Sequence, residues 1–256
     1  MGLNKLWIFG CSFSEGAGCL PQDAYYQFLL PEERGHRWID LLSIDLNLEL
    51  KNRSIGGSSN DGIFKKIIDN LKYIGPDDLV IIGLTDGDRF GIYDEPLISG
   101  STLPEFRQIN IGHIEGSDDL TEVQRETLLN YLVNIRSPYR GVWERHYLSM
   151  GKELCSFIQK TLGTKTILWD TRLWHIFESI HTATNYKVND GHWSYKGHGQ
   201  AYVFMRKQAQ RVNFGEPINE ETLLKLSKFV TISENTNKIN IKKKHKTIRK
   251  MGSGVS

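Results

Sequence analysis

The sequence lacks several features that would assign it to a common functional class. It contains no apolar run near the roughly 18 residues that a membrane-spanning helix needs, and its first residues do not form a signal-peptide pattern. We therefore expect synthesis in the cytoplasm without a signal peptide. The glycine-rich motifs of P-loop and dinucleotide-binding proteins are also absent, so we expect no nucleotide cofactor.

Cysteine is scarce, and the histidines are scattered. The three cysteines, Cys11, Cys19 and Cys155, are an odd number without metal-type spacing, which is typical of reduced thiols. The eight histidines form no His-x-x-x-His pair with an acidic third ligand nearby. The sequence therefore predicts neither a disulfide framework nor a metal site.

Charge is spread unevenly along the chain. The formal net charge is +2, yet residues 238–256 hold seven Lys or Arg side chains and no acid, so the rest of the chain is net acidic. This asymmetry predicts a flexible basic tail that contacts nucleic acid, an acidic protein surface or a membrane surface, the alternative being a solvated terminus. The tail segment 238–250 has no aromatic side chain for stacking on bases, which argues against sequence reading.

Apolar runs and helical patterns alternate along most of the 256 residues. Runs that predict strands lie near residues 5–9, 48–52, 79–83 and 166–169, with a fifth near 184–188. The run at 79–83 is fully apolar and β-branched, which is typical of a central strand. This alternation predicts a doubly wound α/β/α sandwich with a mostly parallel, flavodoxin-like sheet of about five strands.

The sandwich is expected to occupy residues 1–215, followed by a helical extension at 216–237 and the basic tail at 238–256. Residues 91–120 break the alternation, because glycine, serine, proline and scattered acids give no clear period. An insertion of this length predicts a lid or a partner-binding loop. Two helices, near 121–136 and 141–162, follow it, and the first opens with the capping-box pattern Thr121-Glu122-Val123-Gln124.

A serine stands directly after the first predicted strand. Ser12 lies between Gly10 and Gly16, where open α/β sheets place their ligands. A serine hydroxyl needs a base to become nucleophilic at neutral pH. His192 is the predicted base, with Asp190 holding its other ring nitrogen, as in a nucleophilic triad. The alternative is that both segments are ordinary turns.

Three neighbouring residues have competing interpretations. His198 is a second candidate base, but it lies at the start of a helix predicted from about 197 to 212 and suits capping or packing. Trp193 either lines a substrate pocket or belongs to the core. Cys11 precedes Ser12, so its side chain is expected to point to the other side of the turn, which disfavours a thiol nucleophile.

Taken together, these segments resemble the SGNH (GDSL-type) hydrolases, a family of esterases, deacetylases and related acyltransferases. Gly10-Cys11-Ser12 matches the first family block, with Cys11 where the family usually has Asp, and Ile55–Asn60 resembles the second. Ile82–Asp86 falls where the third block belongs, with Thr85 in place of its Asn. Asp190-Gly191-His192-Trp193 matches the last block with a shorter spacing, similar to the branch that contains alginate O-acetyltransferases.

The resemblance implies roles for further residues. The backbone N–H groups of Ser12 and Gly57 would form the oxyanion hole. A third donor would come from the Thr85 position or from Asn60, whose amide could compensate for the missing family Asn. Apart from the resemblance, Arg89 in Asp86-Gly87-Asp88-Arg89 is a candidate to hold an anionic group of the substrate, the alternative being an ion pair with Asp86 or Asp88.

Two hypotheses of function follow. The first is a serine esterase that removes acetyl or other acyl groups from a carbohydrate, with acyl transfer as a variant. The second is a non-enzymatic structural or attachment protein, because the sequence also resembles SGNH-like proteins encoded by tailed phages. Its virion or other protein partners would bind through residues 91–120 and 238–250. The two hypotheses are compatible in a virion-borne deacetylase.

Overall fold

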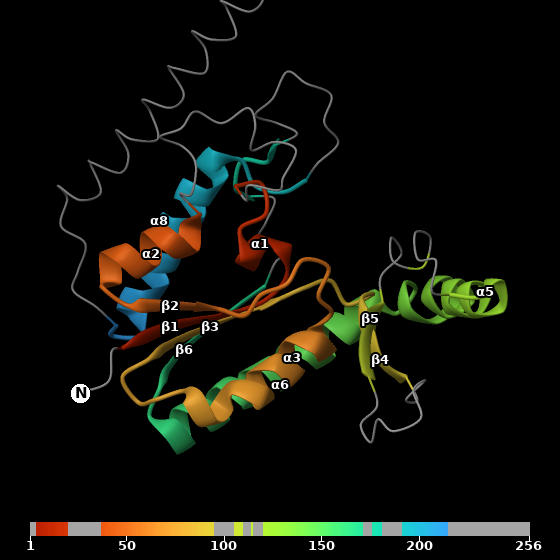
Figure 1. Cartoon of the computed structure of the whole chain (residues 1–256), viewed down its shortest axis with the longest axis horizontal. Helices are drawn as coiled ribbons and strands as arrows, with labels where there is room; N and C mark the ends of the chain where they lie inside the picture. Colours follow the sequence, from red (N-terminus) through yellow and green to blue (C-terminus); the bar gives the residue numbers. More distant parts are fainter. Residues whose placement is uncertain are drawn as a thin grey trace, which may run out of the picture.

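The computed structural model describes residues 4–19, 37–94, 105–109, 114, 120–170, 176–180 and 191–214. These residues contain a parallel sheet of four strands in the order β2-β1-β3-β6 (Figure 1). The strands are β1 (Lys5–Phe9), β2 (Glu49–Asn52), β3 (Leu79–Leu84) and β6 (Lys165–Asp170). Since β6 is the fourth strand of this sheet along the chain, the order is that of flavodoxin-like folds. The predicted α/β class and mostly parallel sheet are confirmed.

The burial of each strand follows its place in the sheet. All six side chains of β3, which pairs with β1 on one side and β6 on the other, are buried. Strand β2 pairs only with β1 within the described part of the chain and is partly exposed throughout. The apolar run at 79–83 therefore marked the interior of the sheet, as buried parallel strands do.

Helices cover both faces of the sheet (Figure 1). On one face lie α2 (Trp38–Leu46) and α8 (Tyr195–Arg211), and on the other lie α3 (Asn60–Asn70) and α6 (Arg140–Leu162). Strand β1 contributes alternate side chains to two cores, because successive residues of a strand point to opposite faces. Leu6 and Ile8 pack with α2 and α8, whereas Trp7 and Phe9 pack with α3 and α6.

Local sequence signals set several helix ends. The side chain of Ser59 accepts a hydrogen bond from the Gly62 N–H and caps α3. Thr121 and Gln124 form the predicted capping box at the start of α5 (Glu122–Tyr131). The helix predicted over 121–136 changes character near its end, where η4 (Leu132–Arg136) is a π-helix.

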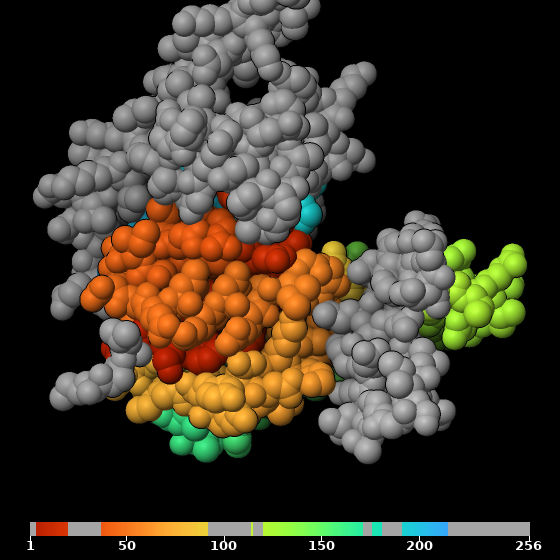
Figure 2. Space-filling model, viewed as in Figure 1, coloured from red at the N-terminus to blue at the C-terminus, as the bar shows by residue number. Residues whose placement is uncertain are grey.

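The segment predicted to be without regular structure contains a hairpin in its described part. Strands β4 (Phe90–Asp94) and β5 (Glu105–Ile109) pair antiparallel and form a separate two-stranded sheet. With α5 and η4 they form a unit that we call the arm, and α5 lies well away from the main sheet (Figures 1 and 2). The expectation of an aperiodic loop from 91 to 120 was therefore wrong for these strands, because cross-strand pairing stabilises sequences with little periodicity of their own.

Three predicted features lie outside the described residues. They are the fifth strand near 184–188, the helical extension at 216–237 and the basic tail at 238–256. The connection between β3 and β6 runs through the arm and α6. The structure thus describes the sheet that carries the candidate site and the arm inserted beside it.

Asp78 gives a first testable prediction about the frame of the sheet. Its buried carboxylate accepts hydrogen bonds from the backbone N–H groups of Lys5 and Gly75 and from the indole N–H of Trp7, at 2.8–2.9 Å. Asp78→Ala would leave these donors without their acceptor, and we expect a loss of about 3 kcal/mol in the free energy of unfolding. Urea denaturation of this variant beside Asp77→Ala, a change at the exposed neighbour, measures the effect. Equal stability of the two variants would contradict the prediction.

Candidate functional site

Ser12 lies at the C-terminal edge of the parallel sheet. It begins the short helix α1 (Ser12–Glu15), which follows β1 and ends at Gly16 in the left-handed conformation (φ 97°). The side chain is 8 % exposed, so it is largely shielded but open to solvent. The preceding Cys11 is almost fully buried, as expected for a side chain on the other side of the turn. This burial favours Ser12 over Cys11 as a nucleophile.

The second glycine-rich segment lies beside Ser12. A Cβ built on Gly56 would lie 3.8 Å from the Cβ of Ser12, so the loop after β2 packs against the first turn of α1. Gly57 has a φ of 75°, a conformation that favours glycine. The Gly56 N–H donates a 2.7 Å hydrogen bond to the carboxylate of Glu15. The sheet thus brings together two segments that are 41 residues apart in sequence.

Glu15 is a residue that the sequence analysis did not single out. Besides its side-chain bond to Gly56, its backbone oxygen accepts hydrogen bonds from the side chains of Arg37 and Asn52, at 3.3 and 3.4 Å. Glu15 therefore ties α1 to the loop after β2 and to the start of α2. The sequence contained one sign of this role, because Glu15 follows Ser12 by three residues and so lies near it in a short helix.

Asn60 and Thr85 meet at the ends of α3 and β3. The Asn60 amide oxygen accepts a 2.8 Å hydrogen bond from the Thr85 N–H, and its nitrogen donates one of 2.9 Å to the Thr85 carbonyl. Both residues are buried. One of the two amide hydrogens of Asn60 is therefore committed to the backbone of Thr85. The two predicted residues therefore lie together, and their hydrogen bonds join the start of α3 to the end of β3.

Among the described residues, Arg89 makes no ion pair with Asp86 or with Asp88, so the predicted alternative is wrong there. Asp86 instead binds Arg140 at 2.5 Å, and that guanidinium also contacts Glu144 at 2.9 Å. Hydrogen bonding to Glu144 raises the pKa of Arg140 above its ordinary value, although burial opposes the shift. Within the described residues, the buried Nη1 of Arg89 has no hydrogen-bond partner. An acceptor supplied by a ligand would satisfy it.

His192 lies next to α1. The centroid of its ring is 5.3 Å from that of Phe13, the residue after Ser12, and its side chain is half-buried. Its backbone oxygen accepts a 2.8 Å hydrogen bond from the Ile180 N–H, which fixes the segment beside the end of the sheet. Within the described residues no hydrogen bond joins Ser12 Oγ to the imidazole. Asp190 lies outside the described residues, so the triad stays a prediction.

His198 is placed as a core residue. Its side chain is fully buried, its Nε2 lies 3.1 Å from the carbonyl oxygen of Ala17, and its ring packs against Trp193. Burial lowers the pKa of His198 to about 4, because the charged form would lose its hydration. This environment fits the packing interpretation of His198, so His192 stays the predicted base. Trp193 is likewise fully buried and packs against Phe13 and Trp169, which favours the core interpretation over a pocket wall.

The lowered pKa of His198 predicts a pH dependence of stability. The unfolded chain binds this proton near pH 6.5, whereas the folded chain binds it only near pH 4. The contribution of His198 is therefore fully present above pH 6.5, and we expect about 3 kcal/mol to be lost as the pH falls toward 4. His198→Gln keeps a donor for Ala17 but does not titrate. Between pH 7.5 and pH 4.5, the free energy of unfolding should decrease less in His198→Gln than in the wild type. An equal decrease in the two proteins would contradict the assignment.

A second polar cluster, also missed in the sequence, lies where the arm joins the sandwich. The Tyr147 hydroxyl contacts both carboxylate oxygens of Asp61 at 3.0 Å and accepts a 2.9 Å hydrogen bond from Arg136. Burial raises the pKa of Tyr147 to about 12. Residues 61, 136 and 147 share no motif or periodicity, so only the folded chain brings them together.

Two further properties concern only the described part of the chain. No helix there is long and apolar enough to cross a membrane. No group of three or more His, Cys, Asp or Glu side chains in the same residues has an arrangement suited to a metal ion.

Comparisons with known proteins give distant structural likenesses. No protein-family model and no curated protein matches the sequence. Among solved structures, the chain is similar to a lipase/acylhydrolase from Enterococcus faecalis, with 12 % identity, a TM-score of 0.36 and coverage of 85 % of this chain and 100 % of that one. It is also similar to a protein assigned to the lipolytic G-D-S-L family from Desulfitobacterium hafniense, with 15 % identity, a TM-score of 0.32 and coverage of 82 % and 99 %. TM-scores below 0.5 leave the function to be argued from the residues of the chain itself.

Proposed function

We propose that the chain is a serine acyl hydrolase of SGNH type, with Ser12 as nucleophile and His192 as its base. The observation that carries the proposal is the convergence at the sheet edge. Ser12, the glycine loop at 56–57 and the ring of His192 come from three distant segments and lie around α1. This edge is where open α/β sheets bind ligands. An ordinary strand-to-helix turn has no need of a nearby histidine, so the position of His192 beside α1 supports a catalytic role.

The reaction follows from these positions. His192 would take the proton from Ser12 Oγ as the oxygen attacks the ester carbonyl carbon, and Asp190 would stabilise the imidazolium. The same proton would pass to the leaving alcohol, giving an acyl-serine. Water, deprotonated by His192, would then release the acid and restore Ser12. The backbone N–H groups of Ser12 and Gly57 would donate to the oxyanion, with the Asn60 and Thr85 pair holding that side of the hole.

The substrate that we propose is an acyl ester of a carbohydrate, with Arg89 as a contact for an acidic group. The resemblance of the sequence blocks to deacetylases supports this choice. The unsatisfied Nη1 of Arg89 supports a hydrogen-bond acceptor on the substrate. An acyltransferase would use the same acyl-serine, with a sugar hydroxyl in place of water.

The test combines turnover with covalent labelling. The full chain is assayed with p-nitrophenyl acetate and treated with a fluorophosphonate, and the labelled peptide is identified by mass spectrometry. Turnover together with a label on Ser12 supports the proposal. No turnover and no label would overturn it.

A structural or attachment role is the second candidate. It is favoured by the arm, because α5 has no buried residue and several apolar side chains of α5, η4 and the start of α6 are exposed. Those side chains are Val123, Val133, Ile135 and Val142. A virion or other assembly partner covering them would fit this hypothesis, and an inert Ser12 would make it the better account.

A further inference from the structure

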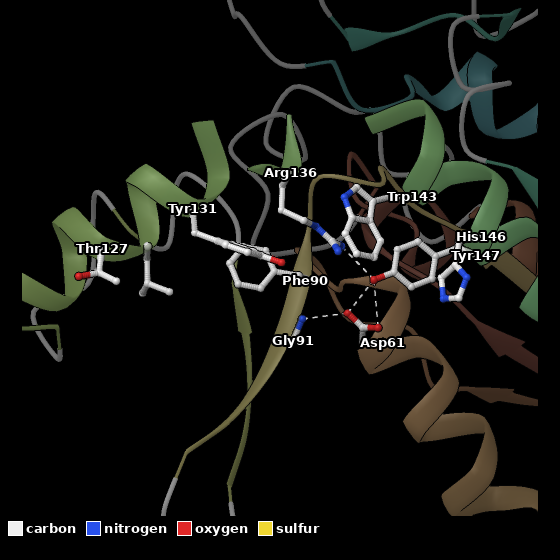
Figure 3. A pocket seen from close by; sticks show the side chains of 10 residues that line it. Asp61, Phe90, Gly91, Thr127, Tyr131, Arg136, Trp143, His146 and Tyr147 are labelled. Atoms are coloured by element: carbon white, nitrogen blue, oxygen red, sulfur yellow. Dashed lines mark hydrogen bonds between the residues drawn. The ribbon is translucent and has the colours of Figure 1, made fainter. Parts of the chain in front are cut away.

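A pocket of about 510 Å³ lies between the arm and the sandwich (Figure 3). This size is within the usual range of small-molecule sites. Its lining comes from α3, β4, α5, η4 and α6, so it exists only because the arm folds against the start of α6. The residues that determine its chemistry are Asp61, Phe90, Tyr131, Arg136, Trp143 and Tyr147.

Arg136 is the central cation of the pocket, and the π-helix positions it. The Ser137 N–H bonds to the oxygen of Leu132, five residues back, so this turn is wider than an α-turn. The side chain of Arg136 is only 3 % exposed, and its guanidinium carbon lies 4.0 Å from the ring centroid of Trp143. Single π-turns of this kind are common at functional sites.

Two hydrogen-bond donors of the pocket are unsatisfied. In the described part of the chain, Nε of Arg136 and Nε1 of Trp143 are buried and have no acceptor. The other contacts of Arg136 are made by Nη2, which donates to the Arg89 carbonyl at 3.0 Å and to the Tyr147 hydroxyl at 2.9 Å. Buried polar groups are normally paired, and both residues line the pocket, so an acceptor oxygen of a ligand would satisfy these two donors.

Asp61 provides the complementary acceptor. Its carboxylate holds the Tyr147 hydroxyl and the Gly91 N–H, at 3.0 Å each. An anionic ligand would be repelled by Asp61 and a cationic one by Arg136. A neutral ligand that carries both donors and acceptors is compatible with the two charges, and hydroxyl groups supply both functions.

Aromatic side chains form the apolar part of the pocket. Phe90 and Tyr131 pack edge to face, with ring centroids 5.1 Å apart, and Tyr131 keeps 37 % of its surface exposed (Figure 3). The faces of such rings are electronegative and favour the C–H groups of a saturated ring. A sugar ring has hydroxyl groups around its edge and C–H groups on its face, so it matches both the polar and the aromatic parts of the pocket.

We infer that this pocket binds one sugar ring, which stacks on Tyr131 and directs hydroxyl oxygens to Arg136 and Trp143. The link to the proposed function is that the ring belongs to the acylated glycan attacked by Ser12. The pocket and the Ser12 site adjoin along the chain, because Asp61 follows Asn60 at the start of α3. Binding of the ring itself does not require catalysis.

The test measures binding and catalysis separately. The full chain carrying Ser12→Ala is titrated with methyl glycosides of neutral hexoses and N-acetylhexosamines, to about 50 mM, by saturation-transfer NMR and calorimetry. We expect at least one glycoside to bind, Tyr131→Ala to weaken it about ten-fold or more, and Tyr131→Phe to retain it. Tyr139→Ala is the matched control, since Tyr139 is an exposed tyrosine that does not line the pocket.

Three results would overturn the inference. These are no binding by any glycoside, equal weakening by Tyr131→Ala and Tyr139→Ala, or preferential binding of acetate or benzoate, which would indicate an anion site. Hydrolysis of p-nitrophenyl acetate by the wild type, a substrate that has no sugar, is measured separately and depends on the Ser12 site. Loss of glycoside binding with normal ester hydrolysis, or the reverse, therefore distinguishes failure of the pocket from failure of the Ser12 site.

Discussion

Ser12→Ala is expected to lower kcat/KM for p-nitrophenyl acetate by about 10³-fold or more, because the proposed reaction passes through an ester of Ser12 Oγ. Removing Oγ eliminates the acyl-serine and leaves His192 and the oxyanion donors to assist direct attack by water. The loss should appear in kcat, since the small acetyl ester makes few contacts that depend on this oxygen. Steady-state kinetics and the burst of p-nitrophenol measure it.

Ser14→Ala is the matched control for this variant. Ser14 lies in the same helix, is fully buried, and its Oγ has no hydrogen-bond partner within the described residues. Its removal should leave turnover and labelling close to the wild type. Cys11→Ala tests the thiol alternative in the same assay. A turnover that survives Ser12→Ala, or disappears in Cys11→Ala, would contradict Ser12 as nucleophile.

Gly197→Ala is expected to reduce the free energy of unfolding by about 4 kcal/mol. A Cβ at this position would lie 2.1 Å from the backbone oxygen of Glu178 and 3.0 Å from the Cβ of Trp193. A backbone atom cannot move aside as a flexible side chain can, so the start of α8 would have to shift. The shift would also disturb the segment that carries His192. Thermal and urea denaturation measure the loss of stability.

Gly141→Ala provides the comparison. Gly141 lies in the first turn of α6, where the nearest atom to an added Cβ is the end of the Arg145 side chain at 4.0 Å. Alanine favours a helix over glycine by up to about 1 kcal/mol, so this variant should match or exceed the wild type in stability. Equal destabilisation by both alanines would show that the contact between α8 and Glu178 is not the cause.

Local rules account for the parts of the fold that could be predicted. The apolar run at 79–83 predicted the central strand, observed as Leu79–Leu84, because a strand buried on both faces needs no polar side chain. Thr121 predicted a helix start, since a side-chain oxygen at that point satisfies a backbone N–H within three residues. The hairpin of the arm had no such signal. Its stability depends on pairing between strands that the sequence separates.

The sequence by itself determined the class of fold and the nomination of Ser12 and His192, because these depend on periodicity and on the order of short blocks. Only the tertiary structure showed which individual polar and aromatic residues are buried and which residues they contact. It buried His198 and Trp193, tied Asn60 to Thr85, and gathered Asp61, Arg136 and Tyr147 around a pocket. The physical reason is that burial and hydrogen-bond partners are set by contacts between distant segments, which no local pattern records.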